Sequence, residues 1–90
     1  MRGVKVKYVA LGKLLKEGRV RKQMNLESAA MVLGLASRQY LSSCEIGRTN
    51  FPAKLLKRAL ELYKIPATDA VSAAVIDFEE SALKFLKGKK

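Results

Sequence analysis

The side chains most suited to chemistry lie between residues 38 and 43 of this 90-residue chain. They are long or hydrogen-bonding side chains, namely Arg38, Gln39, Ser42 and Ser43. An arginine can bind the O6 and N7 atoms of guanine through two hydrogen bonds, and a glutamine can bind N6 and N7 of adenine. Leu41 and Cys44 fall at a spacing that places them on the opposite face of a helix. The segment therefore indicates a helix that reads nucleic-acid bases.

The composition argues against catalysis. The chain has no histidine, which removes histidine-based acid–base chemistry and histidine-containing metal sites. Ser42 and Ser43 consequently have no histidine to activate them as nucleophiles. The single cysteine, Cys44, can form neither an internal disulfide nor a zinc cluster, and we expect it to be a core residue rather than a redox sensor. We expect no enzyme activity, no cofactor and no metal.

The positive charge is concentrated in the first two thirds of the chain. There are 18 Lys and Arg residues against 8 Asp and Glu residues, a net charge of +10. Residues 1–64 hold 14 basic and 4 acidic side chains, whereas residues 65–90 hold 4 of each. Folding alone does not need this asymmetry, so we expect an anionic partner. The alternative is a solvated basic surface that only keeps the protein soluble.

The candidate base-reading residues lie on the second of two short predicted helices. The first spans residues 26–33, with Asn25 as its N-cap and Gly34 as the residue that ends it. The second spans residues 38–46 and has Ser37 as its N-cap. Two short helices joined by a glycine-containing turn are typical of a helix-turn-helix, whose second helix enters the major groove of DNA. We therefore predict that helix 38–46 lies in the major groove.

Three further helices complete the prediction, which is an all-α, compact five-helix bundle. The first helix of the chain spans about residues 10–23, and Gly18 within it indicates close packing against a neighbour. The fourth begins at Pro52, and the fifth spans about residues 68–86. The apolar face predicted for the first helix comprises Leu11, Leu14, Leu15 and Val20.

Residues 1–9 are predicted to form a short, extended, basic arm. Its apolar and basic side chains alternate, with Val4, Val6 and Tyr8 set against Lys5 and Lys7. Such alternation is typical of a half-buried strand, which needs a partner strand and could find one across a dimer. The alternatives are a flexible arm, or an arm whose basic residues, Arg2 among them, enter the minor groove.

A chain of this length without a linker-like stretch indicates one domain. Within it we distinguish the arm at 1–9, a helix-turn-helix core at 10–65 and a C-terminal helix at 66–90. No apolar run is long enough to span a bilayer, and no apolar signal-peptide core follows the basic N-terminus. We expect a cytoplasmic, nucleoid-associated protein.

A longer pattern runs through residues 11–65. It comprises Gly12, Leu15, Arg19, Asn25, Ala30, Leu33, Gly34, Ser37, Tyr40, Leu41, Ser42, Glu45, Gly47, Asn50 and Pro52. This pattern resembles the lambdoid repressor and Cro-like family of helix-turn-helix proteins, often called Xre-type. The resemblance implies a lambda repressor-like fold that binds specific sequences in double-stranded DNA.

The resemblance also implies roles for individual residues. Those expected to face the bases are Arg38, Gln39, Ser42 and Ser43. Those expected to contact the DNA backbone are Asn25, Tyr40, Arg48, Thr49 and Asn50, although Tyr40 could instead edge the helix interface. Arg19 and Glu45 are expected to form a largely buried, structural ion pair between the first helix and the recognition helix.

The C-terminal helix carries an apolar stripe at spacings of four and three residues. The stripe comprises Val71, Val75, Phe78, Ala82 and Phe85. It could pack on the other helices or pair with a second copy, and we name it as a possible dimer interface. The acidic side chains of this helix make a poor surface for DNA, and they are Asp69, Asp77, Glu79 and Glu80.

These observations predict a small transcriptional regulator of a bacterium or phage, acting as a repressor and as a homodimer on double-stranded DNA. The alternatives are an antitoxin-like protein or a protein-interaction module, either of which would use the C-terminal helix to bind a partner protein. No membrane partner is expected.

Overall fold

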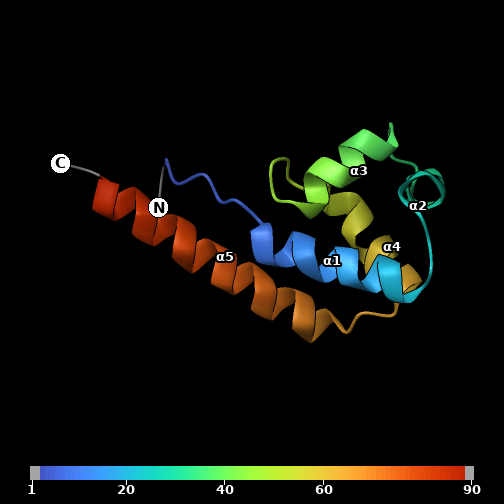
Figure 1. Ribbon diagram of the computed structural model, residues 1–90. Helices are drawn as coiled ribbons and strands as arrows, with labels where there is room; N and C mark the ends of the chain where they lie inside the picture. Colours follow the sequence, from blue (N-terminus) through green and yellow to red (C-terminus); the bar gives the residue numbers. More distant parts are fainter. Residues whose placement is uncertain (1–2, 89–90) are drawn as a thin grey trace.

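A computed structural model describes residues 3–88 of the chain, and this part folds into five helices without a strand. The all-helical prediction is therefore confirmed. Figure 1 shows the long last helix running beside the first one, with the three shorter helices on the other side of the first. The helices are α1 (Val9–Arg21), α2 (Leu26–Leu33), α3 (Arg38–Glu45), α4 (Ala53–Tyr63) and α5 (Ala67–Gly88).

Local capping interactions set the ends of α2 and α3. The Asn25 side chain accepts a hydrogen bond from the Ser28 amide at 2.8 Å, and the Ser37 hydroxyl accepts one from the Tyr40 amide at 3.1 Å. Gly34 ends α2 with a φ of 77°, a left-handed conformation that glycine adopts without steric cost. These caps confirm the predicted starts of both helices, and α3 ends one residue earlier than predicted.

Close contacts between helices define the core. Leu15, Leu33 and Tyr63 are among the most buried side chains, and they come from α1, α2 and α4. A Cβ atom at Gly18 would lie 2.8 Å from Ile65 Cδ1, so this glycine does permit close packing, as predicted. The predicted face of α1 was wrong at Val20, which is exposed. Arg19 is buried instead, because it faces α3 and forms an ion pair there.

The N-terminal segment forms no strand. Residues 4–8 carry neither helix nor sheet, and they run along the C-terminal half of α5 (Figure 1). The predicted alternation is nevertheless present, since Val4, Val6 and Tyr8 are half-buried whereas Lys5 and Lys7 are exposed. The side of a helix therefore takes the place of the partner strand. Arg2 lies outside the described residues.

α5 packs along α1 through a polar contact. Asp77, predicted to be part of an acidic surface of this helix, is instead almost completely buried. Its carboxylate accepts hydrogen bonds from the backbone N–H groups of Ala10 and Leu11, at 2.8 and 2.9 Å. These groups lie in the first turn of α1, where no helical carbonyl is available to them. Asp77 therefore caps α1 from a different helix.

The long axis of the molecule follows α5. The described residues extend over 45 × 25 × 20 Å, and the C-terminal end of α5 projects beyond the other helices (Figure 1). Among residues 3–88, no helix combines the length and the apolar character needed to cross a membrane.

Candidate nucleic-acid interface

The candidate interface is built on α3, which buries one face and exposes the other. Leu41 and Cys44 are buried against the rest of the protein, as their spacing predicts. Arg38 and Gln39, at the N-terminal end of the helix, are exposed. Ser42 and Ser43 are half-buried on the following turn. The structure therefore places Arg38 and Gln39 at the surface and the two serines closer to the protein.

α3 is held against α1 by a buried ion pair. Arg19 Nε lies 2.7 Å from Glu45 Oε2, and Arg19 Nη2 lies 3.1 Å from Glu45 Oε1. A third hydrogen bond joins Arg19 Nη1 to the Met24 carbonyl at 2.8 Å. The two side chains are 9% and 3% exposed, and the hydrogen bonds to Glu45 raise the pKa of Arg19. The structure thus brings together the two residues that the resemblance pairs, and both belong to the scaffold beneath the exposed face.

Gly12 allows α1 and α3 to approach each other closely. A Cβ atom at this position would lie 2.5 Å from the Cys44 carbonyl oxygen and 2.6 Å from that of Glu45. No side chain fits at such distances, because both neighbours are backbone atoms. Together with the ion pair, this contact fixes how far α3 stands out from the rest of the protein.

The loop after α3 continues the exposed surface. Gly47 begins it with a φ of 82°, and the Arg48 and Thr49 amides donate to the Ser43 carbonyl at 3.0 and 3.3 Å. Arg48 and Asn50 are exposed, while Thr49 is half-buried. These hydrogen bonds anchor the start of the loop to α3, so Arg48 is held close to the end of the helix.

The two remaining candidate backbone contacts lie at helix starts. Asn25 is exposed, and its side chain is engaged in capping α2. Tyr40 is half-buried in the first turn of α3, which fits either of the two roles considered for it. Cys44 is 2% exposed, and burial raises the pKa of its thiol, so it belongs to the core.

One residue of the exposed face was missed. Ile46 directly follows α3 and is 51% exposed. It lies seven residues after Gln39, about two helical turns, and therefore on the same face. An exposed isoleucine can contact the methyl group of thymine, which polar side chains do not recognise as well. The helical spacing between Gln39 and Ile46 could have identified Ile46 from the sequence.

Behind the ion pair lies Tyr63, which is completely buried and whose hydroxyl has no hydrogen-bond partner among the described residues. Burial, and to a smaller extent the negative charge of Glu45, raises the pKa of Tyr63 to about 12. A buried hydroxyl without a partner loses its hydration and gains nothing in return.

Tyr63→Phe is expected to keep full stability at neutral pH and to resist alkali better than the wild type. An unfolded tyrosine has a pKa near 10, so the folded protein binds this proton more tightly. The stabilisation is present below about pH 10 and is lost as the pH rises towards 12. Urea unfolding at pH 8 and pH 11 measures it. At pH 11 the wild type should have lost about 1.4 kcal/mol more than Tyr63→Phe. Equal losses in both proteins would contradict this assignment.

Comparison of the chain with protein-family profiles, with curated proteins and with solved structures found no match.

Proposed function

We propose that the protein is a sequence-specific regulator of transcription that binds double-stranded DNA through a helix-turn-helix formed by α2, residues 34–37 and α3. The observation that carries this proposal is the position of Arg38 and Gln39. Both are exposed at the N-terminal end of a short helix whose other face is buried. In this motif the N-terminal residues of the second helix reach the base edges in the major groove.

The exposed residues divide into two groups by chemistry. Arg38 and Gln39 have the side chains that make paired hydrogen bonds with guanine and adenine, and Ile46 offers an apolar contact to thymine. Ser42 and Ser43 can add single hydrogen bonds to bases. The DNA backbone is assigned to side chains around them, namely Asn25, Tyr40, Arg48, Thr49 and Asn50. Phosphate contacts fix the register, and base contacts supply the specificity.

Electrostatics supports the same orientation. The net charge of +10 belongs entirely to residues 1–64, which contain α3 and the loop after it. α5 holds four acidic and two basic side chains, a net charge of −2, and leads away from this region. A basic surface supplies most of the sequence-independent affinity for DNA. Binding at a promoter would then block RNA polymerase, so we propose repression as the outcome.

Arg38→Ala and Gln39→Ala are each expected to reduce the preference for the cognate site over bulk DNA by about 10- to 100-fold, because one paired base contact contributes about 1–3 kcal/mol. Fluorescence titration of a selected site and of random DNA measures this ratio. The matched comparison is Arg48→Ala, which should weaken binding to both DNAs equally. An unchanged preference in both α3 variants would show that α3 does not read the bases.

We further propose that the protein binds DNA as a homodimer formed through α5. Val71, Val75 and Phe78 are each about half exposed and lie on one side of this helix. Of the other two residues named for this interface, Ala82 is buried, and Phe85 is half-buried with Gly3 of the N-terminal segment near its ring. A second copy is the occupant we propose, because the same three apolar side chains of another chain would cover this exposed stripe.

Val75→Glu is expected to convert the dimer to a monomer, because it places a charge in an apolar interface. Sedimentation equilibrium measures the mass, and circular dichroism checks that the helices remain. A wild-type protein that is monomeric at all concentrations would refute the homodimer. If that monomer instead formed a stable complex with a second protein, and if Val75→Glu abolished this complex, the antitoxin-like alternative would replace the homodimer.

A further inference from the structure

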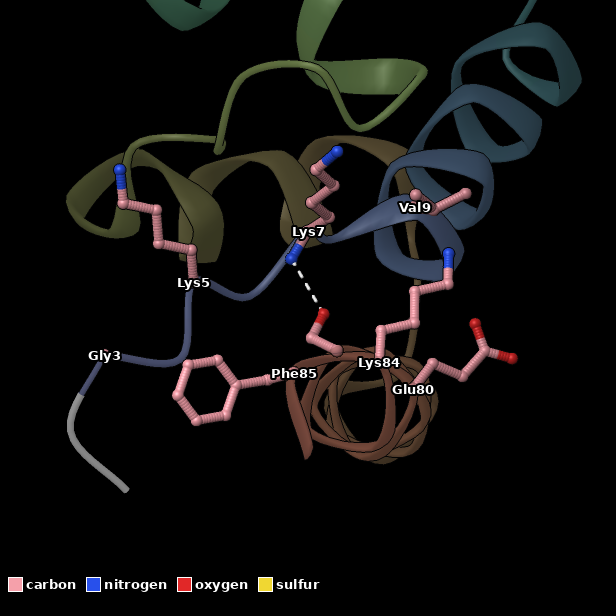
Figure 2. A pocket seen from close by; sticks show the side chains of 8 residues that line it. Gly3, Lys5, Lys7, Val9, Glu80, Lys84 and Phe85 are labelled. Carbon is pink, nitrogen blue, oxygen red and sulfur yellow. Dashed lines mark hydrogen bonds between the residues drawn. The ribbon is translucent and has the colours of Figure 1, made fainter. Parts of the chain in front are cut away.

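The N-terminal segment, residues 3–8, is attached to α5 at two points. The backbone N–H of Lys7 donates to the Ser81 hydroxyl at 3.1 Å, which replaces a strand hydrogen bond with one to a helix side chain. Four residues earlier, Gly3 lies against the ring of Phe85, where a Cβ atom would be 3.7 Å from Phe85 Cζ. The two contacts hold the segment in one course along α5, as Figure 2 shows.

This course determines where the lysines point. Figure 2, which looks along α5, shows Lys5 and Lys7 directed away from that helix. In the same view they extend toward the side on which the chain between α3 and α4 passes. Val4 and Val6, which alternate with them, are half-buried. The alternation therefore leaves the two ammonium groups in solvent on the side of the candidate DNA surface.

A direct contact links Val9, the first residue of α1 and the one that follows this segment, to the loop that carries Arg48. A Cβ atom at Gly47 would lie 2.7 Å from Val9 Cγ2 and 3.0 Å from Val9 Cα, so the two backbones touch. Lys7 is two residues before Val9, and Arg48 is the residue after Gly47. Since each residue spans at most about 3.6 Å, both side chains begin within about 7 Å of this contact. Lys7 and Arg48 thus begin close to each other, and Lys5 lies two residues farther along the same segment.

We propose that Lys5 and Lys7 bind backbone phosphates of the DNA, next to the phosphates assigned to Arg48, and that α5 holds them in place for this purpose. The proposal rests on the proposed function. Lysine is a compact charge that suits a phosphate and does not discriminate between bases as a paired donor does. A segment fixed on a helix also loses little conformational entropy on binding, and it is not free to follow the minor groove.

The test is the salt dependence of DNA binding by the full chain, measured with the selected site and with random DNA at 50–200 mM KCl. Each phosphate contact contributes about 0.9 to the slope of log K against log salt. We expect the Lys5→Ala/Lys7→Ala variant to lose about 1.8 of this slope. Its deficit in affinity should then be roughly tenfold larger at 50 mM than at 200 mM salt. Its preference for the selected site should equal that of the wild type.

Lys87→Ala is the matched control for one lost charge. Lys87 follows Phe85 by two residues, so it projects from the opposite side of α5, and its removal should leave the slope within about 0.3 of the wild-type value, well below one phosphate contact. If the wild type binds DNA and the double variant has the same slope, the proposal is overturned and the proposed function stands. A change in preference between A·T and G·C flanks would overturn it in favour of minor-groove contact. A wild type that does not bind DNA would refute both.

Discussion

Glu45→Ala should lower the free energy of unfolding by about 3–5 kcal/mol, the usual cost of removing one partner of a buried ion pair. The reason lies in the surroundings of Arg19, whose guanidinium would keep its charge while losing two hydrogen bonds, of 2.7 and 3.1 Å. For a domain of this size, each kcal/mol corresponds to about 4–8 °C in melting temperature. Thermal unfolding followed by circular dichroism should therefore show a decrease of roughly 12 °C or more.

Two comparisons separate the lost ion pair from the lost side chain. Glu27→Ala removes an exposed glutamate from the first turn of α2 and should cost about 1 kcal/mol or less. Arg19→Met/Glu45→Leu removes both charges and should recover most of the stability, since apolar pairs often replace buried ion pairs without loss. If Glu45→Ala had the same melting temperature as the wild type, the ion pair would not hold α3 in place. The expected result also means that lost DNA binding in Glu45→Ala is no sign of a DNA contact.

Asp77→Ala is expected to destabilise the protein by about 3 kcal/mol, the second-largest effect of a single substitution that we predict. The backbone N–H groups of Ala10 and Leu11 would lose their acceptor in a site that water does not reach freely. Hydrogen bonds to a charged group contribute about 1.5–3 kcal/mol each, and a buried N–H without a partner costs about 1–3 kcal/mol. Denaturant unfolding gives the total loss, and amide hydrogen exchange at Ala10 and Leu11 locates it.

An asparagine variant of Asp77 and an alanine variant of an exposed neighbour provide the controls for this effect. Asp77→Asn keeps one acceptor oxygen and should lose about half as much stability as the alanine variant. Glu79→Ala, two residues away and exposed, should change stability by less than about 0.5 kcal/mol. Equal behaviour of the Asp77 and Glu79 variants would mean that α5 does not cap α1. Faster exchange confined to the start of α1 in Asp77→Ala is the specific signature expected.

The elements that carry the candidate DNA surface follow from local signals in the sequence. Asn25, Gly34 and Ser37 act on backbone groups within about four residues of themselves, so their effect does not depend on the rest of the fold. The same holds for the exposure of Gln39 and the burial of Leu41, which a helical period of 3.6 residues specifies. For this reason α2 and α3, with their faces, were predicted almost to the residue.

The course of the N-terminal segment and the position of α5 depend on contacts between distant parts of the chain. Asp77 meets Ala10 across 67 residues, and Lys7 meets Ser81 across 74. Periodicity shows only on which side of a helix a residue lies. Asp77, which lies near other acidic residues in the sequence, was therefore grouped with them on an acidic surface. The alternating N-terminal segment was for the same reason predicted to be a strand. Which groups meet such a side chain depends on how the helices pack. In this protein the packing makes Asp77 the cap of α1, and it places the basic N-terminal segment on one side of α5.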